Sequence, residues 1–215
     1  MEYVDTVATF FQDGGIDMIF ISLVLAIGVA IAVERVIYLQ ITRKQSRDLW
    51  QELSPLLKAG NYVKAMEATA QSKAMVSKVI NHGLNSCRTA RGREDIETAM
   101  EEGLMEAVPR LERRIPYLAT FANICTLLGL LGTIFGLIEA FTSVNKADPA
   151  LKAEILSSSI SKAMNTTAYG LIAAIPLLLV HSYLQQKTTE MIEGMEMAVV
   201  KFTNMVMDRA RTGQK

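Results

Sequence analysis

Two apolar segments of the sequence carry polar side chains whose types and spacing could conduct an ion. The stretch CTLLGLLGTIFGLIEAF, residues 125–141, contains Thr133 and a single carboxylate, Glu139. A second apolar stretch further along the chain contains Thr167 and begins at Lys162. A lone threonine in a membrane helix usually bonds to its own backbone, but two threonines on facing helices could line a narrow, wettable path. We therefore take Thr133 and Thr167 as candidates for an ion pathway.

These residue types do not suggest catalysis. An intramembrane enzyme needs a nucleophile or metal ligands at membrane depth, and the sequence has no G-x-S-x-G, no H-E-x-x-H and no pair of aspartates there. His181 falls at the inner end of the second stretch, where an interfacial position is expected. The sequence thus predicts no catalytic residue, no metal site and no cofactor, and we do not expect an enzyme.

One acidic and one basic residue stand near the outer ends of the two segments. Glu139 lies six residues outward of Thr133, and Lys162 lies five residues outward of Thr167. In antiparallel helices both charges then lie roughly 8–9 Å above the threonines, at one level. Charges at membrane depth tend to pair, so we expect an ion pair. The alternative is that both side chains simply reach interfacial water.

If each segment is a helix, with about 100° of rotation per residue, small residues form one face of each. The first face contains Ala122, Cys125, Gly129, Gly132, Thr133, Gly136 and Ala140, and the second contains Ala163, Thr167, Gly170 and Ala174. Gly132 and Gly136 make a G-x-x-x-G pair. In lipid, small residues let helix backbones approach closely, and dispersion and polar contacts then hold the helices together. Both segments are therefore expected to pack tightly.

Three long apolar segments, residues 16–39, 117–141 and 163–184, predict an all-α membrane protein with three transmembrane helices. About 20 apolar residues are needed to cross the hydrocarbon core. The first segment has a shorter uninterrupted run, between Asp17 and Glu34, which its apolar flank extends. It lacks the basic leader of a signal peptide, so we expect a retained span.

Basic residues predict the orientation. The region 40–116 carries 13 Lys and Arg and the tail 185–215 carries five, whereas the N-terminal segment 1–15 carries none. Positive charge accumulates on the cytoplasmic side of a membrane. The region 40–116 and the tail are therefore expected to be cytoplasmic, and the N-terminus and the short loop 142–162 to be periplasmic.

The net charge argues against one class of binding partner, and the positions of the cysteines argue against a disulfide. The formal net charge is zero, so no basic field is available to bind a nucleic acid. Cys125 lies inside an apolar segment and Cys87 lies in a charged region, so we expect no disulfide.

The cytoplasmic parts are expected to be helical extensions of the spans. In REDIETAMEEGLMEAVPRLERRI the acids come early and the bases late, as the helix dipole favours, and a kink or break is expected at Pro109 or Pro116. Residues 54–93, with SP, AGN and TARGRE, suggest short helices joined by turns.

The tail has an apolar stripe at helical spacing, formed by Met191, Met195, Val199, Phe202 and Val206. Packing against other cytoplasmic helices is the expected role. A membrane-surface helix or a docking site is the alternative.

Three motifs resemble those of the MotA/TolQ/ExbB family. LERRIPYLATFANICTLLGLLGTIFGLIEAF resembles the second span of that family, AMNTTAYGLIAAIP resembles its third span, and VERVIYL resembles the end of its first. Three spans, an outward N-terminus and a large cytoplasmic loop are similar to the TolQ/ExbB branch rather than to four-span MotA.

The resemblance implies an ion-driven motor subunit. Members of the family form homopentamers in the bacterial inner membrane around a dimer of an ExbD- or TolR-like partner. That partner has one membrane helix and carries the ion-binding aspartate, and the work reaches a TonB- or TolA-like envelope protein. This agrees with the lack of a deep carboxylate in the three segments.

By resemblance Thr133 and Thr167 match the pore threonines of the family. Its close-packing and bending positions match Gly129, Gly132, Gly136, Gly170 and Pro176, and Ala174 lies with them on the small face.

Two departures from the family concern charge and ion choice. TolQ and ExbB usually carry Glu where Lys162 stands, and often Asn or His where Glu139 stands. Many proton-driven relatives have Ala-Thr where this chain has Thr166 and Thr167. The added hydroxyl could complete an oxygen cage for Na+ in place of H+ as the transported ion, or Thr166 could serve a helix contact. A membrane scaffold without ion flow is a further alternative.

Overall fold

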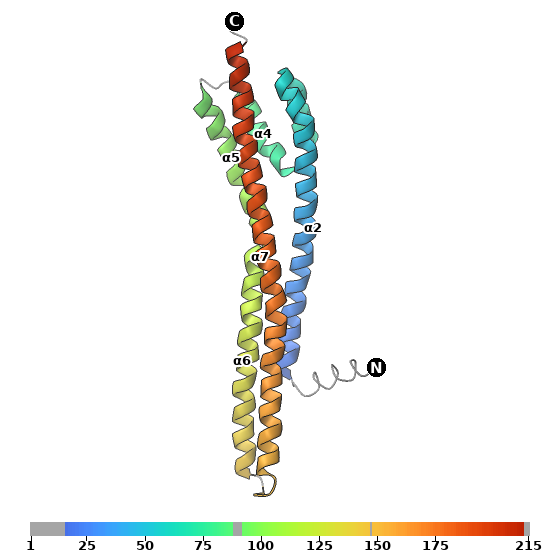
Figure 1. Ribbon diagram of the computed structural model, residues 1–215, viewed down its shortest axis with the longest axis vertical. Coiled ribbons are helices and arrows are strands. Elements are labelled where there is room, and N and C mark those ends of the chain that lie inside the picture. Colours follow the sequence, from blue (N-terminus) through green and yellow to red (C-terminus); the bar gives the residue numbers. More distant parts are fainter. Residues whose placement is uncertain (1–15, 88–91, 147, 213–215) are drawn as a thin grey trace, which may run out of the picture. The chain divides into compact units, whose positions relative to one another are not determined.

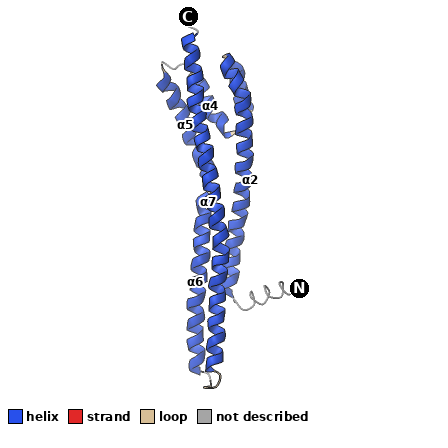
Figure 2. Ribbon diagram, in the orientation of Figure 1, coloured by secondary structure: helices blue, strands red, loops and turns tan. Residues whose placement is uncertain are grey.

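The computed structural model describes residues 16–87, 92–146 and 148–212, which form helices joined by short turns (Figure 1). The helices are α2 (Ile16–Ala59), α3 (Tyr62–Gln71), α4 (Met75–Ser86), α5 (Arg93–Glu112), α6 (Ile115–Lys146) and α7 (Lys152–Thr212). These described parts contain no strand, which confirms the all-α prediction (Figure 2). The predicted N-terminal segment 1–15 lies outside them.

Three helical stretches are long and apolar enough to cross a membrane. The predicted segments 16–39, 117–141 and 163–184 lie within α2, α6 and α7 respectively. Large apolar side chains of these helices point outward, among them Leu127, Ile134, Phe135, Ile172 and Leu179. An outward apolar surface of this kind suits a lipid environment.

The chain divides into two compact units, and α2 and α7 contribute to both. The first unit comprises the residues up to Glu34 together with Arg114–Tyr183, and the second comprises Arg35–Arg113 together with the residues from Leu184 onward. The predicted transmembrane residues fall mainly in the first unit. The predicted cytoplasmic regions fall in the second.

The core of the first unit is built largely from small side chains. Its buried cluster consists of Ile21, Ala122, Cys125, Ala173, Ala174 and Leu177. Gly28 of α2 also meets Leu177, because a Cβ at that glycine would come within 3.0 Å of the leucine methyl groups. The three membrane helices therefore pack around one thin core.

The second unit has a core of large side chains instead. Its fully buried residues include Leu53, Leu57, Ile80, Leu84, Met100, Leu111 and Phe202. In the predicted tail stripe, Met195, Val199, Phe202 and Val206 are buried and Met191 is half-buried. Phe202 comes close to Gly83 of α4, which confirms that the stripe packs against other helices of this unit.

The break between α5 and α6 occurs at two arginines. Arg113 has an extended ψ of 132°, and Arg114 has a φ of 67°, in the left-handed region that few non-glycine residues adopt. Pro116 then stands in the first turn of α6, where its missing N–H costs no helical bond. The sequence predicted a kink or break at Pro109 or Pro116; the break lies just before Pro116, and α5 runs through Pro109.

Helix α2 does not end where the sequence suggested. The SP pair was expected to start a set of short helices, but α2 runs through Pro55 to Ala59. The turn comes at Gly60, whose φ of 71° is left-handed, and the Gly60 and Asn61 N–H groups donate to carbonyls of the last turn. Pro55 lacks the N–H that would bond to the carbonyl four residues earlier and its ring crowds that carbonyl, yet α2 continues for another turn. The short helices α3 and α4 follow, as predicted.

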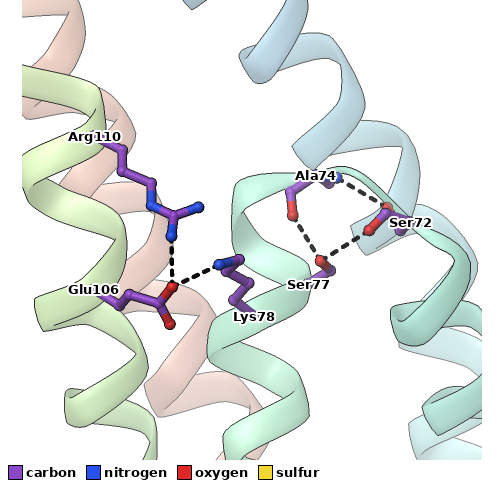
Figure 3. Close-up of polar contacts among 6 residues, drawn as sticks. All are labelled: Ser72, Ala74, Ser77, Lys78, Glu106 and Arg110. Atoms are coloured by element: carbon purple, nitrogen blue, oxygen red, sulfur yellow. Dashed lines mark hydrogen bonds and ion pairs between the residues drawn. The ribbon is translucent and has the colours of Figure 1, made fainter. Parts of the chain in front are cut away.

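A polar cluster joins α4 to α5 on the surface of the second unit (Figure 3). The Glu106 carboxylate accepts bonds from Lys78 at 2.6 Å and from Arg110 at 2.7 Å. The hydrogen bond from Lys78 is the main reason that the pKa of Glu106 lies below its ordinary value. All three side chains are about half exposed, so these ion pairs stabilise the unit only slightly.

The start of α4 is closed by two serines in the same view (Figure 3). The Ser72 hydroxyl accepts from the Ala74 N–H at 3.1 Å, and the Ser77 hydroxyl donates to the Ala74 carbonyl at 2.7 Å. These bonds hold the residue that precedes the first turn of α4 and do not cap the free N–H groups of the helix itself. Beneath them, Gly103 of α5 would place a Cβ only 2.9 Å from the Val79 Cα, so α4 and α5 also approach closely.

Candidate functional site in the α6–α7 helix pair

Helices α6 and α7 touch backbone to backbone at two glycines. A Cβ at Gly129 would come within 3.2 Å of the Cα atoms of both Thr167 and Gly170. A Cβ at Gly170 would come within 2.7 Å of the Cys125 carbonyl oxygen. Because backbone atoms cannot rotate out of the way, any larger residue at either position must push the helices apart.

The G-x-x-x-G pair packs on α7 of the same chain. A Cβ at Gly132 would collide with the Thr166 methyl group, and one at Gly136 would come within 2.6 Å of the Ala163 Cβ. Ala163 and Thr166 are 3% and 2% exposed. The sequence predicted that the two small faces pack tightly, and the structure places this contact within one chain.

The two remaining packing candidates differ in location. Ala174 is buried and belongs to the cluster around Cys125 and Leu177. Pro176 lies within the continuous helix α7 and its side chain is exposed. Ala174 is thus part of the close contact in this chain, whereas Pro176 presents its ring on the outside of the helix.

The three candidate threonines each donate to a backbone carbonyl. The Thr133 hydroxyl donates to the Leu130 carbonyl of its own helix at 2.6 Å, and the Thr166 hydroxyl donates to the Lys162 carbonyl of its own helix at 3.1 Å. The Thr167 hydroxyl instead crosses to α6 and donates to the Gly129 carbonyl at 2.7 Å. This last bond is possible because Gly129 has no side chain to separate the backbones.

Thr133 and Thr167 therefore reach one level of α6. Their acceptors, the carbonyls of Leu130 and Gly129, belong to consecutive residues, which differ in height by about 1.5 Å along a helix. Thr133 and Thr167 are both half-buried, whereas Thr166 is buried against Gly132. Two partly accessible hydroxyls and their carbonyls thus form one polar level in the α6–α7 pair.

Glu139 and Lys162 lie close together toward the end of this helix pair at which α6 ends and α7 begins. The Lys162 Nζ is 3.7 Å from a Glu139 carboxylate oxygen, a distance that fits an ion pair and is too long for a strong hydrogen bond. In the single chain both side chains keep much of their surface exposed, 44% for Lys162 and 65% for Glu139. The arrangement has the expected partners and leaves both groups open to further contacts.

A polar groove lies beside Lys162 and extends from it toward the start of α7. It encloses about 330 Å³ and is lined by Ser158, Ser159, Ser161, Lys162 and Asn165. Asn165 did not stand out in the sequence, although its position three residues after Lys162 puts both on one helical face. Among the described residues, no group of three or more His, Cys, Asp or Glu side chains is placed to hold a metal ion.

Two polar links of the first unit were also missed by sequence reasoning. The Ser22 and Tyr169 hydroxyls lie 2.9 Å apart and join α2 to α7, and Arg114 pairs with Glu34 at 2.6 Å. Ser22 is an isolated polar residue in an apolar run, and that isolation was the available signal; Tyr169 closely follows the polar residues Asn165, Thr166 and Thr167 and does not stand out. The first link joins α2 to the helix that carries Thr167, and the second is a half-exposed ion pair just before α6.

Comparison with known proteins identifies similar chains. A profile of the MotA/TolQ/ExbB proton channel family matches residues 71–197. A biopolymer transport protein ExbB homolog of Methanothermobacter thermautotrophicus is 29% identical over 206 residues, which are 95% of this chain and 71% of that protein. The Tol-Pal system protein TolQ of Haemophilus influenzae is 30% identical over 52% of this chain and 49% of its own length.

The biopolymer transport protein ExbB of Salmonella typhimurium is 30% identical over 64% of this chain and 60% of its own length. The match thus spans about half to three fifths of each of these two bacterial relatives. The matched residues of the profile include all of α6 and the α7 segment with its threonines.

Proposed function

The chain belongs to the MotA/TolQ/ExbB proton channel family, and we propose that it is the multi-span subunit of an ion-driven motor in a bacterial inner membrane. In this proposal the chain forms a homopentamer around the membrane helices of an ExbD- or TolR-like dimer. Ion flow through the assembly then drives work on a TonB- or TolA-like envelope protein. The names of the ExbB and TolQ relatives, which refer to biopolymer transport and to the Tol-Pal system, support this class of function.

The observation that carries the proposal is the polar level formed by Thr133 and Thr167. Their hydroxyls sit on the consecutive carbonyls of Leu130 and Gly129, and both side chains are partly accessible. A hydroxyl can donate one hydrogen bond and accept others. Each threonine can therefore offer its oxygen lone pairs to a cation or a water while it donates to a carbonyl of α6. A rigid, glycine-packed helix pair keeps the two hydroxyls in place.

The titratable group must come from a partner under this proposal. Apart from Glu139 near the outer end, the segments 117–141 and 163–184 contain no acid. A carboxylate that alternately binds and releases a proton at membrane depth is therefore assigned to the single-span partner. The role of this chain is to offer that carboxylate a polar, preorganised wall.

The location of Thr166 bears on the choice of ion. Sodium needs several oxygen ligands, and the hydroxyl of Thr166 was the candidate for an additional one. That side chain is 2% exposed, packs on Gly132 and donates to the Lys162 carbonyl. This supports a packing role, and we therefore favour protons over sodium.

Reconstitution tests the motor against the scaffold. The chain is coexpressed with a single-span partner that bears a membrane aspartate, and the purified complex is placed in liposomes with a pH-sensitive dye. We expect the two proteins to copurify and protons to enter down an imposed gradient without sodium, with the flux lost when the partner aspartate becomes asparagine. A chain that copurifies with no such partner, or a complex that conducts only with sodium, would contradict the proton motor.

A further inference from the structure

The second unit has a groove between α2 and α7 that no contact within the described chain fills. It encloses about 520 Å³, and Arg43, Arg47 and Trp50 of α2 line one side of it. Met197, Lys201 and Gly194 belong to the α7 side, and a Cβ at Gly194 would meet nothing within 4 Å. Met197 is 55% exposed, which leaves an apolar side chain open at the groove.

The rim of this groove is positively charged. Arg43, Arg47 and Lys201 form no ion pair with a described residue. Two acids also line the groove. Glu190 is paired with Lys187 at 2.8 Å and also lies within electrostatic reach of Arg43, and Glu193 is the second acid, so the three cations outnumber the acids of the lining by one. An apolar floor with a basic rim suits a partner surface that is apolar in the centre and acidic around it.

Helix α5 carries a surface of this kind. Its inner face, with Met100, Gly103 and Ala107, is buried in the unit. On the outer face Met105 is 74% exposed, and Glu101 and Glu102 stand beside it without an ion-pair partner among the described residues. We call this surface, Glu101, Glu102 and Met105, the α5 ridge.

We propose that the α5 ridge of one copy of the chain binds in the α2–α7 groove of the next copy. Glu101, Glu102 and Met105 are all exposed in the single chain and none of them lines the groove, so the ridge does not fill the groove of its own chain. A surface that binds a different surface on an identical neighbour makes a head-to-tail contact, and such contacts can close into a ring. The inference rests on the oligomer in the proposed function and names the cytoplasmic contact that would hold it.

This contact has an apolar part and a charged part. Met105 meets the apolar floor near Trp50 and Met197, where the flexible thioether side chains can adapt to one another. Glu101 and Glu102 face Arg43 and Arg47. These four charged residues are all exposed in the single chain, so their pairing between copies needs no rearrangement of the unit.

Charge reversal tests the pairing. Glu101→Lys with Glu102→Lys, and separately Arg43→Glu with Arg47→Glu, should each raise the dissociation constant of the oligomer at least about tenfold, as measured by mass photometry in mild detergent. The chain with all four changes presents a basic ridge to an acidic groove and should recover most of the affinity. Purely additive losses in the fourfold variant would overturn the proposal.

Cysteine crosslinking gives a second, independent test. In a Cys87→Ser, Cys125→Ala background, Met105→Cys with Met197→Cys should form disulfides between copies under mild oxidation and give a ladder of multimers on a non-reducing gel. Met105→Cys with Val63→Cys is the matched control, since Val63 is 71% exposed on α3 and lies outside the groove. This control should not give the ladder.

The outcomes separate this contact from the motor itself. A parent chain that stays monomeric at every concentration contradicts both the proposed oligomer and this interface. A parent chain that assembles, but whose assembly withstands charge reversal and whose cysteines do not crosslink, overturns only the interface. Crosslinking of Met197→Cys exclusively to the single-span partner would assign the groove to that protein and likewise overturn the proposal.

Discussion

The two units of this chain are both helical, yet they are held together in different ways. The first unit brings backbones into contact at Gly129 and Gly170 and seats small side chains of α7 on Gly132 and Gly136, and it turns its large apolar side chains outward. The second unit also has close glycines, at Gly83 and Gly103, but large side chains such as Phe202 fill its core. Moving a leucine from lipid into a protein core gives no hydrophobic free energy, whereas moving it out of water does.

The comparison teaches where each unit is vulnerable. In the first unit stability depends on the distance between two backbones, so added volume at the contact should do the most damage. In the second unit it depends on apolar area removed from water, so removed volume should do the most damage. Polar groups on either surface should matter little for folding and are free to serve function.

The largest effect is expected from added volume in the first unit. Gly129→Leu should prevent α6 and α7 from packing, because its side chain would enter the space of the Thr167 and Gly170 backbone. The loss should reach the exceptional range above about 4–5 kcal/mol, or leave no folded chain. Thermal unfolding in detergent and resistance to protease measure it. Ala168→Leu, which also introduces a leucine but at an exposed position of α7, is the control and should remain folded.

Removed volume in the second unit should cost somewhat less. Phe202 is fully buried and touches the Gly83 region, so Phe202→Ala should leave a cavity and destabilise the unit by about 3–5 kcal/mol. Chemical denaturation followed by circular dichroism provides the value. Val63→Ala removes apolar volume from an exposed site and should cost less than about 0.5 kcal/mol. Equal losses of stability for Phe202→Ala and Val63→Ala would show that buried apolar area does not hold the second unit together.

A smaller effect is expected at the charged pair. Glu139→Gln and Lys162→Met should each change the stability of the isolated chain little, because both side chains are largely exposed at a separation of 3.7 Å. Their coupling energy should lie within about 0–1 kcal/mol in the single chain and should grow in the oligomer if assembly buries the pair. A double-mutant cycle on both forms gives the two values. A coupling near zero in the oligomer would show that the two groups are independent.

The smallest effect concerns the Cys87 thiol. Burial raises the pKa of Cys87 from 9.0 to about 11, so little reactive thiolate is present near neutral pH. Alkylation of a Cys125→Ala variant should therefore reach half its maximal rate near pH 11 when folded, and near pH 9 when unfolded. Because the folded state holds this proton more tightly, the contribution of Cys87 to the free energy of unfolding should be constant below pH 9 and fall as pH rises toward 11. Cys87→Ala should remove that part of the fall.

Periodicity alone identified the packing faces. The glycines of α6 and the apolar stripe of the tail lie where helical spacing put them, because a small or apolar stripe must face a neighbour. The small face of α6 did not predict whether Gly132 contacts the same chain or another copy. That choice depends on chain connectivity and loop length, which helical spacing does not encode.

Other features could not be predicted because they depend on atoms brought together from distant positions. The bond from Thr167 to the Gly129 carbonyl requires a particular rotamer on a particular helix crossing. The α2–α7 groove combines residues near position 47 with others near position 197. The SP pair was expected to belong to a region of short helices and turns, but α2 continues through Pro55, with Leu53 and Leu57 fully buried on either side of it.

Proton flux through threonine variants tests the central claim, that the polar level of α6 and α7 carries the ion. In liposomes that contain the chain and its single-span partner, Thr133→Val and Thr167→Val should each assemble and each lose most of the flux, since valine keeps the shape and removes the hydroxyl. Thr126→Val is the matched control, because Thr126 donates to the Ala122 carbonyl of its own helix at 3.2 Å and lies two turns away from Thr133. Its flux should equal that of the parent complex. Undiminished flux in both Thr133→Val and Thr167→Val would contradict the account.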